Sequence, residues 1–99
     1  GAYKFPPKLD FARIETIAAQ MDTPLVLHGG SGLTDEDFRH AIASGISKIN
    51  IFTDINVAYA EGAKKALAAG AVSATDMFPY LVEAVKEATV KKMKLFSMK

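Results

Sequence analysis

A histidine followed directly by a glycine-rich turn is the feature of this sequence best suited to binding a ligand. His28 precedes Gly29, Gly30, Ser31 and Gly32. Glycines let the backbone turn sharply and bring its N–H groups close to an anion. Imidazole is a common zinc ligand, although a catalytic zinc usually needs about three protein ligands. The segment therefore predicts an anion-binding site beside His28. This histidine can bind a metal only together with ligands from other parts of the protein.

A second polar group follows another short apolar run. Residues 46–52 are rich in β-forming side chains and include Asn50, and Thr53 and Asp54 follow directly. In parallel α/β folds the C-terminal ends of the strands carry the ligand site, and βα barrels hold phosphate between the loops after their last two strands. The two strand ends together predict a phosphate site between their loops.

Other interpretations of these residues stay open on the residues alone. The glycine turn also fits a plain connection between a strand and a helix, with His28 in a hydrogen-bonded structural role. His-Gly-Gly is similar to the oxyanion-hole loop of some lipases and esterases, but the chain holds no G-x-S-x-G nucleophile motif. The spacing departs from the P-loop and dinucleotide fingerprints, which disfavours nucleotide binding. Solvated helix faces are predicted for His40, Lys64, Lys65, Lys91, Lys92 and Lys94.

Helices and strands must alternate to position these residues. The apolar run at residues 25–27 predicts a buried parallel strand, and residues 46–52 predict a second one. Helical spacing predicts four helices, in the order helix, strand, helix, strand, helix, helix. The expected helices are residues 11–21 capped by Asp10, residues 35–44 opened by a Thr34–Asp37 capping box and ended by Gly45, a helix capped by Thr53 or Asp54 and running to about Ala69, and a last helix from Asp76 onward.

The composition narrows the functional classes. The 99 residues are 49% hydrophobic and 23% charged, as in an ordinary soluble domain, and the net charge is +1 with both signs intermixed. This charge provides no general field for nucleic acid or an anionic membrane, so neither is expected as a partner. The chain has no cysteine, no membrane-length apolar run and no signal-peptide pattern, which together predict a cytoplasmic protein.

Two parallel strands are too few to form a closed α/β fold. Parallel sheets need helices on both faces, and a complete barrel takes roughly 250 residues. The sequence therefore predicts residues 1–99 to be one segment of a larger α/β domain.

The two motifs and their separation resemble the class II ketose-bisphosphate aldolases, the zinc-dependent fructose- and tagatose-bisphosphate aldolase group. The resemblance is carried by residues 24–32, PLVLHGGSG, and by residues 45–53, GISKINIFT, with support from the opening residues GAY and PKLDF. It implies a (β/α)8 TIM barrel whose C-terminal part is this chain, spanning about strands seven and eight with flanking helices. It also implies a lyase of carbohydrate metabolism that splits a ketose phosphate or bisphosphate reversibly into dihydroxyacetone phosphate and an aldehyde.

The resemblance also assigns roles to individual residues. His28 corresponds to a zinc ligand, and the zinc polarises the ketone of dihydroxyacetone phosphate. The phosphate-binding positions that it implies are Gly1, Gly29, Gly30, Ser31, Asn50, Ile51, Phe52 and Thr53. A monovalent cation near the phosphate loop is a further expected cofactor. The carboxylic acid that moves the proton belongs to an earlier strand, so no catalytic acid or base is expected in this segment.

Phe52 departs from the pattern of the fructose-specific relatives, which tend to carry an aspartate there. A phenyl ring cannot accept hydrogen bonds from sugar hydroxyls, so another ketose phosphate stays open as the substrate. The expected partners are a sugar phosphate, the remainder of the barrel in the same or a separate chain, and further copies in a homo-oligomer. The alternative is a non-catalytic fragment or assembly segment, and the 99 residues alone are predicted to be inactive.

Overall fold

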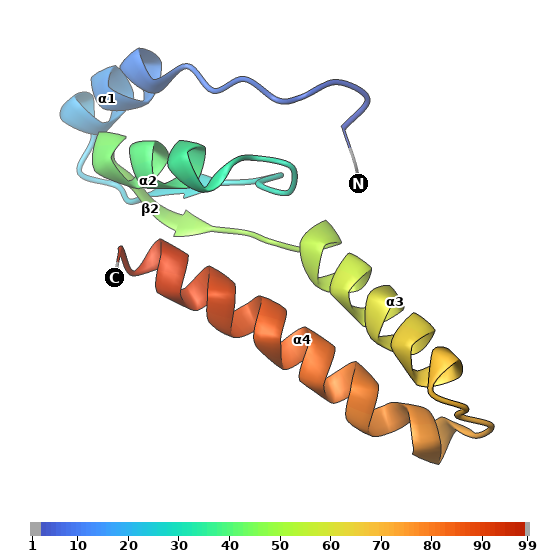
Figure 1. Cartoon of the computed structure of the whole chain (residues 1–99). Coiled ribbons are helices and arrows are strands. Elements are labelled where there is room, and N and C mark those ends of the chain that lie inside the picture. The colour runs from blue at the N-terminus through green and yellow to red at the C-terminus, as the bar shows by residue number, and fades with distance from the viewer. Residues whose placement is uncertain (1–2, 99) are drawn as a thin grey trace.

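A computed structural model describes residues 3–98 as an α/β arrangement of four helices and two short parallel strands (Figure 1). The order of these elements is the one that the sequence predicts. The helices are α1 (Phe11–Gln20), α2 (Asp35–Ser44), α3 (Thr53–Ala68) and α4 (Ala74–Phe96), and the strands are β1 (Leu25–Leu27) and β2 (Ile46–Ile49).

Side-chain caps fix the starts of the first two helices as predicted. The Asp10 carboxylate accepts a hydrogen bond from the Arg13 N–H at 3.0 Å, which satisfies one of the unpaired donors at the start of α1. At the start of α2, the Asp37 N–H donates to the Thr34 hydroxyl and the Thr34 N–H donates to the Asp37 carboxylate. In this capping box each side chain accepts a hydrogen bond from the other residue's N–H, which satisfies two backbone donors at the helix start.

Four predicted boundaries were wrong. Helix α1 ends at Gln20 rather than at residue 21. Strand β2 ends at Ile49 rather than at residue 52. Helix α3 starts at Thr53 with Phe52 as its N-cap and no side-chain cap hydrogen bond, so neither Thr53 nor Asp54 caps it. Helix α4 starts at Ala74 rather than at Asp76.

The early start of α4 has a clear physical cause. The Ser73 hydroxyl accepts from the Asp76 N–H at 3.2 Å, and the Asp76 carboxylate accepts from the Val72 N–H at 3.2 Å. Asp76 therefore lies at the third helical position, where its carboxylate reaches back over the helix start. Hydrogen bonds from the Ser73 side chain and then from the Val72 N–H hold the pKa of this carboxyl below its usual value.

The parallel pairing of the strands brings their C-terminal ends together. Leu27 lies opposite Ile49 in the register, and the Asn50 N–H donates to the Leu27 carbonyl at 3.0 Å. This hydrogen bond extends the pairing one residue beyond β2. His28 and Asn50 therefore leave the sheet at the same edge.

The described residues form an elongated body with a small core. Its extents are 56 × 28 × 20 Å and its radius of gyration is 16.8 Å, against about 13 Å for a compact domain of this length. The α3–α4 hairpin extends away from the sheet, while the C-terminal end of α4 returns beside α2 and β2 (Figure 1). The buried apolar side chains are few: Phe38, Ala41, Ile46, Ala66 and Leu95.

Many large apolar side chains are exposed on this body, among them Phe78 and Met93, each 65% exposed. A body of this shape leaves apolar faces that a larger fold would cover. Among residues 3–98, no helix combines the length and the apolar character needed to cross a bilayer.

Candidate functional site

His28 and Asn50 are in direct contact at the exit of the sheet. The His28 Nδ1 and the Asn50 Nδ2 are 3.1 Å apart. An asparagine amide can present either its N–H or its oxygen by turning over, so Asn50 can stabilise either tautomer of the ring. The His28 ring itself is exposed to solvent. Asn50 therefore orients an imidazole that is accessible to a ligand.

The glycine turn packs tightly onto the core. Gly30 is buried, and a Cβ built on it would lie 3.1 Å from the Phe38 ring and 3.4 Å from methyl groups of Ile49 and Ile51. A larger residue at Gly30 would push the turn away from β2. The Ile51 side chain, which is partly buried, thus packs under the turn.

Ser31 and Asp54 join the two strand exits. The Asp54 N–H, in the first turn of α3, donates to the Ser31 Oγ at 3.4 Å. Ser31 is only 7% exposed, and its hydroxyl proton is left for another acceptor because the oxygen accepts from Asp54. The structure therefore brings the two loops into contact.

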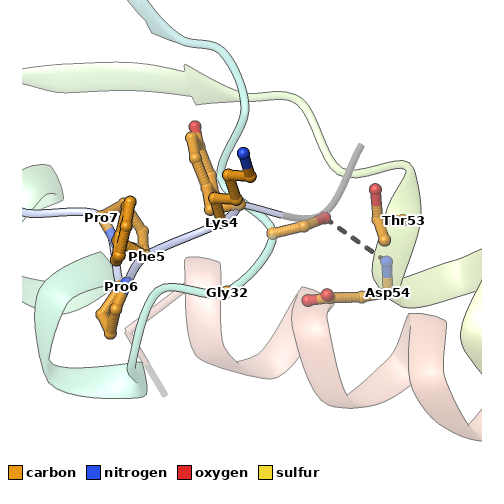
Figure 2. A pocket seen from close by; sticks show the side chains of 9 residues that line it. Lys4, Phe5, Pro6, Pro7, Gly32, Thr53 and Asp54 are labelled. Carbon is orange, nitrogen blue, oxygen red and sulfur yellow. Dashed lines mark hydrogen bonds between the residues drawn. The ribbon is translucent and has the colours of Figure 1, made fainter.

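A pocket of about 390 Å³ opens beside this contact. Residues 4–7 line one side of it and Thr53 and Asp54 the other, with Gly32 between them (Figure 2). Ser31 and Tyr3 complete the lining. The lining residues include a hydroxyl side chain, Thr53, and one charged side chain of each sign, Lys4 and Asp54.

Tyr3 fastens the N-terminal segment to the glycine turn. Its hydroxyl donates to the Gly29 carbonyl at 2.7 Å. Gly29 has φ +65, and a Cβ there would lie 2.5 Å from the Tyr3 hydroxyl oxygen. Because a peptide plane is rigid, fixing the Gly29 carbonyl also fixes the direction of the Gly30 N–H. Tyr3 therefore sets the orientation of one backbone donor of the turn.

One predicted site residue stands apart from these contacts. Phe52 is 74% exposed at the N-cap of α3, where its carbonyl accepts from the N–H groups of Ile55 and Asn56. Its ring is thus an apolar surface beside the strand exits. Gly1 lies outside the described residues.

His28 fits as one ligand of a zinc site, the metal that the resemblance implies, because its imidazole is exposed and oriented by Asn50. Within residues 3–98, no three His, Cys, Asp or Glu side chains come together in a group that could hold a metal ion. A site with three such protein ligands would therefore need at least one ligand from outside the described residues.

One residue predicted to be solvated is a partner of the site instead. The Lys92 ammonium lies 2.8 Å from the Asp54 carboxylate, and its side chain is 20% exposed. The prediction of a solvated face was therefore wrong for Lys92. Sequence reasoning also missed Tyr3 and Lys4 as neighbours of the glycine turn. The local pattern holds no signal for contacts between segments so far apart in the chain.

Comparisons with known proteins identify the family of this chain and individual relatives. Residues 1–99 match the family described as fructose-bisphosphate aldolase class-II. The chain is 49% identical over 67 residues to the sulfofructosephosphate aldolase of Alkalicoccus urumqiensis, which is 68% of this chain and 23% of that protein.

A solved structure shows the same architecture. The crystal structure of the YdjI aldolase from Escherichia coli K12 is similar to this chain with a TM-score of 0.83 and 36% sequence identity. The similarity covers 91% of this chain and 34% of that one. The chain thus spans about a quarter to a third of the length of these relatives. It belongs to the class II fructose-bisphosphate aldolase family.

Proposed function

We propose that this chain is the C-terminal part of a (β/α)8 barrel that catalyses reversible, zinc-dependent aldol cleavage of a ketose phosphate or bisphosphate. The products are dihydroxyacetone phosphate and an aldehyde. The observation that carries the proposal is the pair of contacts between the strand exits, His28 with Asn50 and Ser31 with Asp54. They gather an imidazole, hydroxyls and a glycine turn at the edge where such barrels bind phosphate.

The relatives support this class of reaction. The name of the Alkalicoccus protein gives its substrate as sulfofructosephosphate, a phosphorylated ketose, and the Escherichia protein is named as an aldolase. A phosphorylated substrate agrees with the turn and hydroxyls at the strand exits. Two named aldolases are thus similar to this chain over most of its length.

The phosphate group is assigned to the gap between the two strand exits. Gly29, Gly30 and Ser31 supply backbone N–H groups and a hydroxyl from one side. Asn50, Ile51, Phe52 and Thr53 follow β2, and the first turn of α3 adds the partial positive charge of a helix N-terminus. Gly1 and a monovalent cation are further proposed neighbours of the phosphate.

The ketone end of the substrate is assigned to the His28 side. His28 is proposed to bind the zinc, and Asn50 to orient the imidazole through the contact with its Nδ1. A bound zinc supplies Lewis-acid polarisation of the substrate carbonyl. The residue that moves the proton is proposed to lie in another part of the barrel.

Phe52 is proposed to restrict the choice of ketose. Its ring is exposed at the strand exit and offers no hydrogen-bond acceptor to a sugar hydroxyl. A substrate that presents a less hydroxylated surface there is favoured. This position makes a ketose phosphate other than fructose bisphosphate a natural candidate.

The remaining parts of the site must come from outside these residues. The segment offers one metal ligand and no proposed acid or base, so the isolated 99 residues are expected to be inactive. The proposed enzyme is a cytoplasmic homo-oligomer in which the rest of the barrel, in the same or another chain, completes the site. Its apolar faces are then covered by that remainder.

Replacing Ser31 with alanine, or Thr53 with valine, is expected to raise KM for dihydroxyacetone phosphate in the full-length protein. Each change removes a hydroxyl assigned to the phosphate, and a hydrogen bond to a charged group is worth about 2 kcal/mol, which predicts a rise of about thirtyfold. The measurement is the initial rate of aldol condensation at varied dihydroxyacetone phosphate.

The matched control is Thr16→Val. The Thr16 hydroxyl donates to the Ala12 carbonyl within α1, away from both strand exits. This variant is expected to keep the wild-type KM. Unchanged KM values in both site variants would count against the phosphate assignment.

A further inference from the structure

Lys92 makes the one ion pair among the described residues that connects distant elements. It lies near the C-terminal end of α4, and its Nζ is 2.8 Å from the Asp54 Oδ2 in the first turn of α3. The other three ion pairs each join residues three apart in the sequence and have largely exposed side chains. The side chains of Lys92 and Asp54 are 20% and 31% exposed, so this pair is shielded from solvent.

A second contact fixes the Lys92 ammonium in place. It lies 4.8 Å from the centroid of the Phe38 ring, which is fully buried. Phe38 also packs against Phe96 of α4, with ring centroids 5.1 Å apart. The end of α4 is thus anchored to the core under the glycine turn, and Lys92 extends from this anchor to Asp54.

Asp54 is the residue through which Lys92 reaches the site. Its carboxylate pairs with Lys92, its N–H donates to Ser31, and it lines the pocket between the loops. A carboxylate without a partner in this place would repel a bound phosphate. The ammonium cancels that charge and holds the turn of α3 that contacts Ser31.

We propose that Lys92 is a positioning residue of the phosphate site, which it keeps attractive to an anion by neutralising Asp54. The proposal rests on the proposed function, because it needs phosphate to bind between the strand exits. It assigns the C-terminal helix a part in substrate binding that does not require contact with the substrate.

The pairing of Lys92 with Asp54 allows a test that separates the effect of charge from the effect of lost packing. Removing Lys92 alone leaves a partly buried carboxylate beside the phosphate, whereas removing both charges leaves none. The variants Lys92→Met and Asp54→Asn keep the approximate shape of each side chain. If Lys92 acts through charge, the double variant recovers what the single lysine variant loses.

The experiment measures the inhibition constant of inorganic phosphate, KM for dihydroxyacetone phosphate and kcat on the full-length protein. Lys92→Met is expected to raise the inhibition constant of phosphate and KM for dihydroxyacetone phosphate about tenfold each. This is the order expected for one uncompensated charge near a partly shielded anion. The kcat of this variant is expected to stay within about twofold of the wild-type value. Lys92→Arg keeps the charge and is expected to bind phosphate as the wild type does. In the double variant, which carries Lys92→Met and Asp54→Asn, both constants are expected to return to within about threefold of the wild-type values.

Lys91→Met is the matched control. Lys91 is the exposed neighbour of Lys92 on the same helix, so this variant changes the net charge equally without touching Asp54. It is expected to bind phosphate as the wild type does. If Lys92→Met does not fold, Asp54→Asn replaces it in the test. This variant leaves the Lys92 ammonium without its partner carboxylate, so it is expected to bind phosphate at least as tightly as the wild type.

The outcomes separate this proposal from the proposed function. A wild-type protein that binds phosphate, with equal binding by Lys92→Met, would overturn the role of Lys92 alone. A double variant as weak as Lys92→Met would also overturn it, because packing rather than charge would then explain the loss. A wild-type protein that binds neither phosphate nor dihydroxyacetone phosphate would overturn both proposals.

Discussion

Replacing His28 with alanine is expected to remove the proposed zinc, and with it nearly all of the proposed aldolase turnover, from the full-length protein. His28 is exposed at the end of β1, so its loss leaves no cavity in the core and the fold should persist. Losing a ligand of a catalytic metal removes several kcal/mol of transition-state stabilisation, which predicts at least about a thousandfold lower kcat. The measurements are metal content per protomer by mass spectrometry and the rate of aldol cleavage.

His40→Ala provides the matched control for this prediction. His40 is the other histidine of the chain and lies on α2, where its ring stacks on Phe11 with centroids 3.7 Å apart. Its replacement removes an imidazole without touching the strand exits, so metal content and kcat should stay at wild-type values. Full zinc content and an undiminished rate in His28→Ala would contradict the assignment of His28 as a ligand.

Replacing Gly45 with alanine is expected to produce the largest loss of stability. Gly45 ends α2 with φ +123, a backbone conformation that disfavours a side chain. A Cβ there would also lie 2.6 Å from the Cβ of Ala18, so α1 would have to move. Strain and overlap together predict a loss of about 3 kcal/mol in the free energy of unfolding. Urea denaturation of the full-length protein measures this loss.

Gly70→Ala separates the two causes. Gly70 has φ +92, but a Cβ on it would meet no atom within 4 Å. This control carries the backbone strain without the overlap and is expected to lose about 1 kcal/mol. Equal losses in the two variants would show that contact between α1 and the end of α2 does not restrict residue 45.

The sequence was sufficient to predict the features that depend on neighbours along the chain. The Asp10 cap and the Thr34–Asp37 capping box form over three residues, so residue types at fixed spacing identify them. The parallel pairing follows from a helix between two strands. That pairing is also what places His28 beside Asn50, so this contact could be expected in outline.

The features that sequence reasoning missed depend on contacts between distant segments. Tyr3 contacts Gly29 across 26 residues, and Lys92 contacts Asp54 across the length of the α3–α4 hairpin. Lys92 looks locally like any lysine on an exposed helix face, because helical periodicity reports the element and not its tertiary neighbours. The end of β2 was missed for a related reason: Ile51 and Phe52 are β-forming residues, but after Asn50 the chain leaves the sheet and enters α3.

The small core also has a consequence for function. Few apolar side chains are buried within these residues, and several large ones are exposed. The strand exits are nevertheless held by specific contacts from the N-terminal segment and from α4. The contacts within this segment therefore hold the two strand exits together, and under the proposed function the rest of the barrel would supply the other parts of the site.

The most direct test is an aldol-cleavage assay of the full-length protein before and after removal of zinc by a chelator. The assay follows dihydroxyacetone phosphate released from fructose bisphosphate, tagatose bisphosphate and sulfofructose phosphate. We predict release from at least one of these ketoses, its loss after chelation and its recovery when zinc is added back, with none from the isolated 99 residues. Undiminished cleavage by the zinc-free protein, or no cleavage of any of these substrates, would contradict the proposal of a zinc-dependent aldolase.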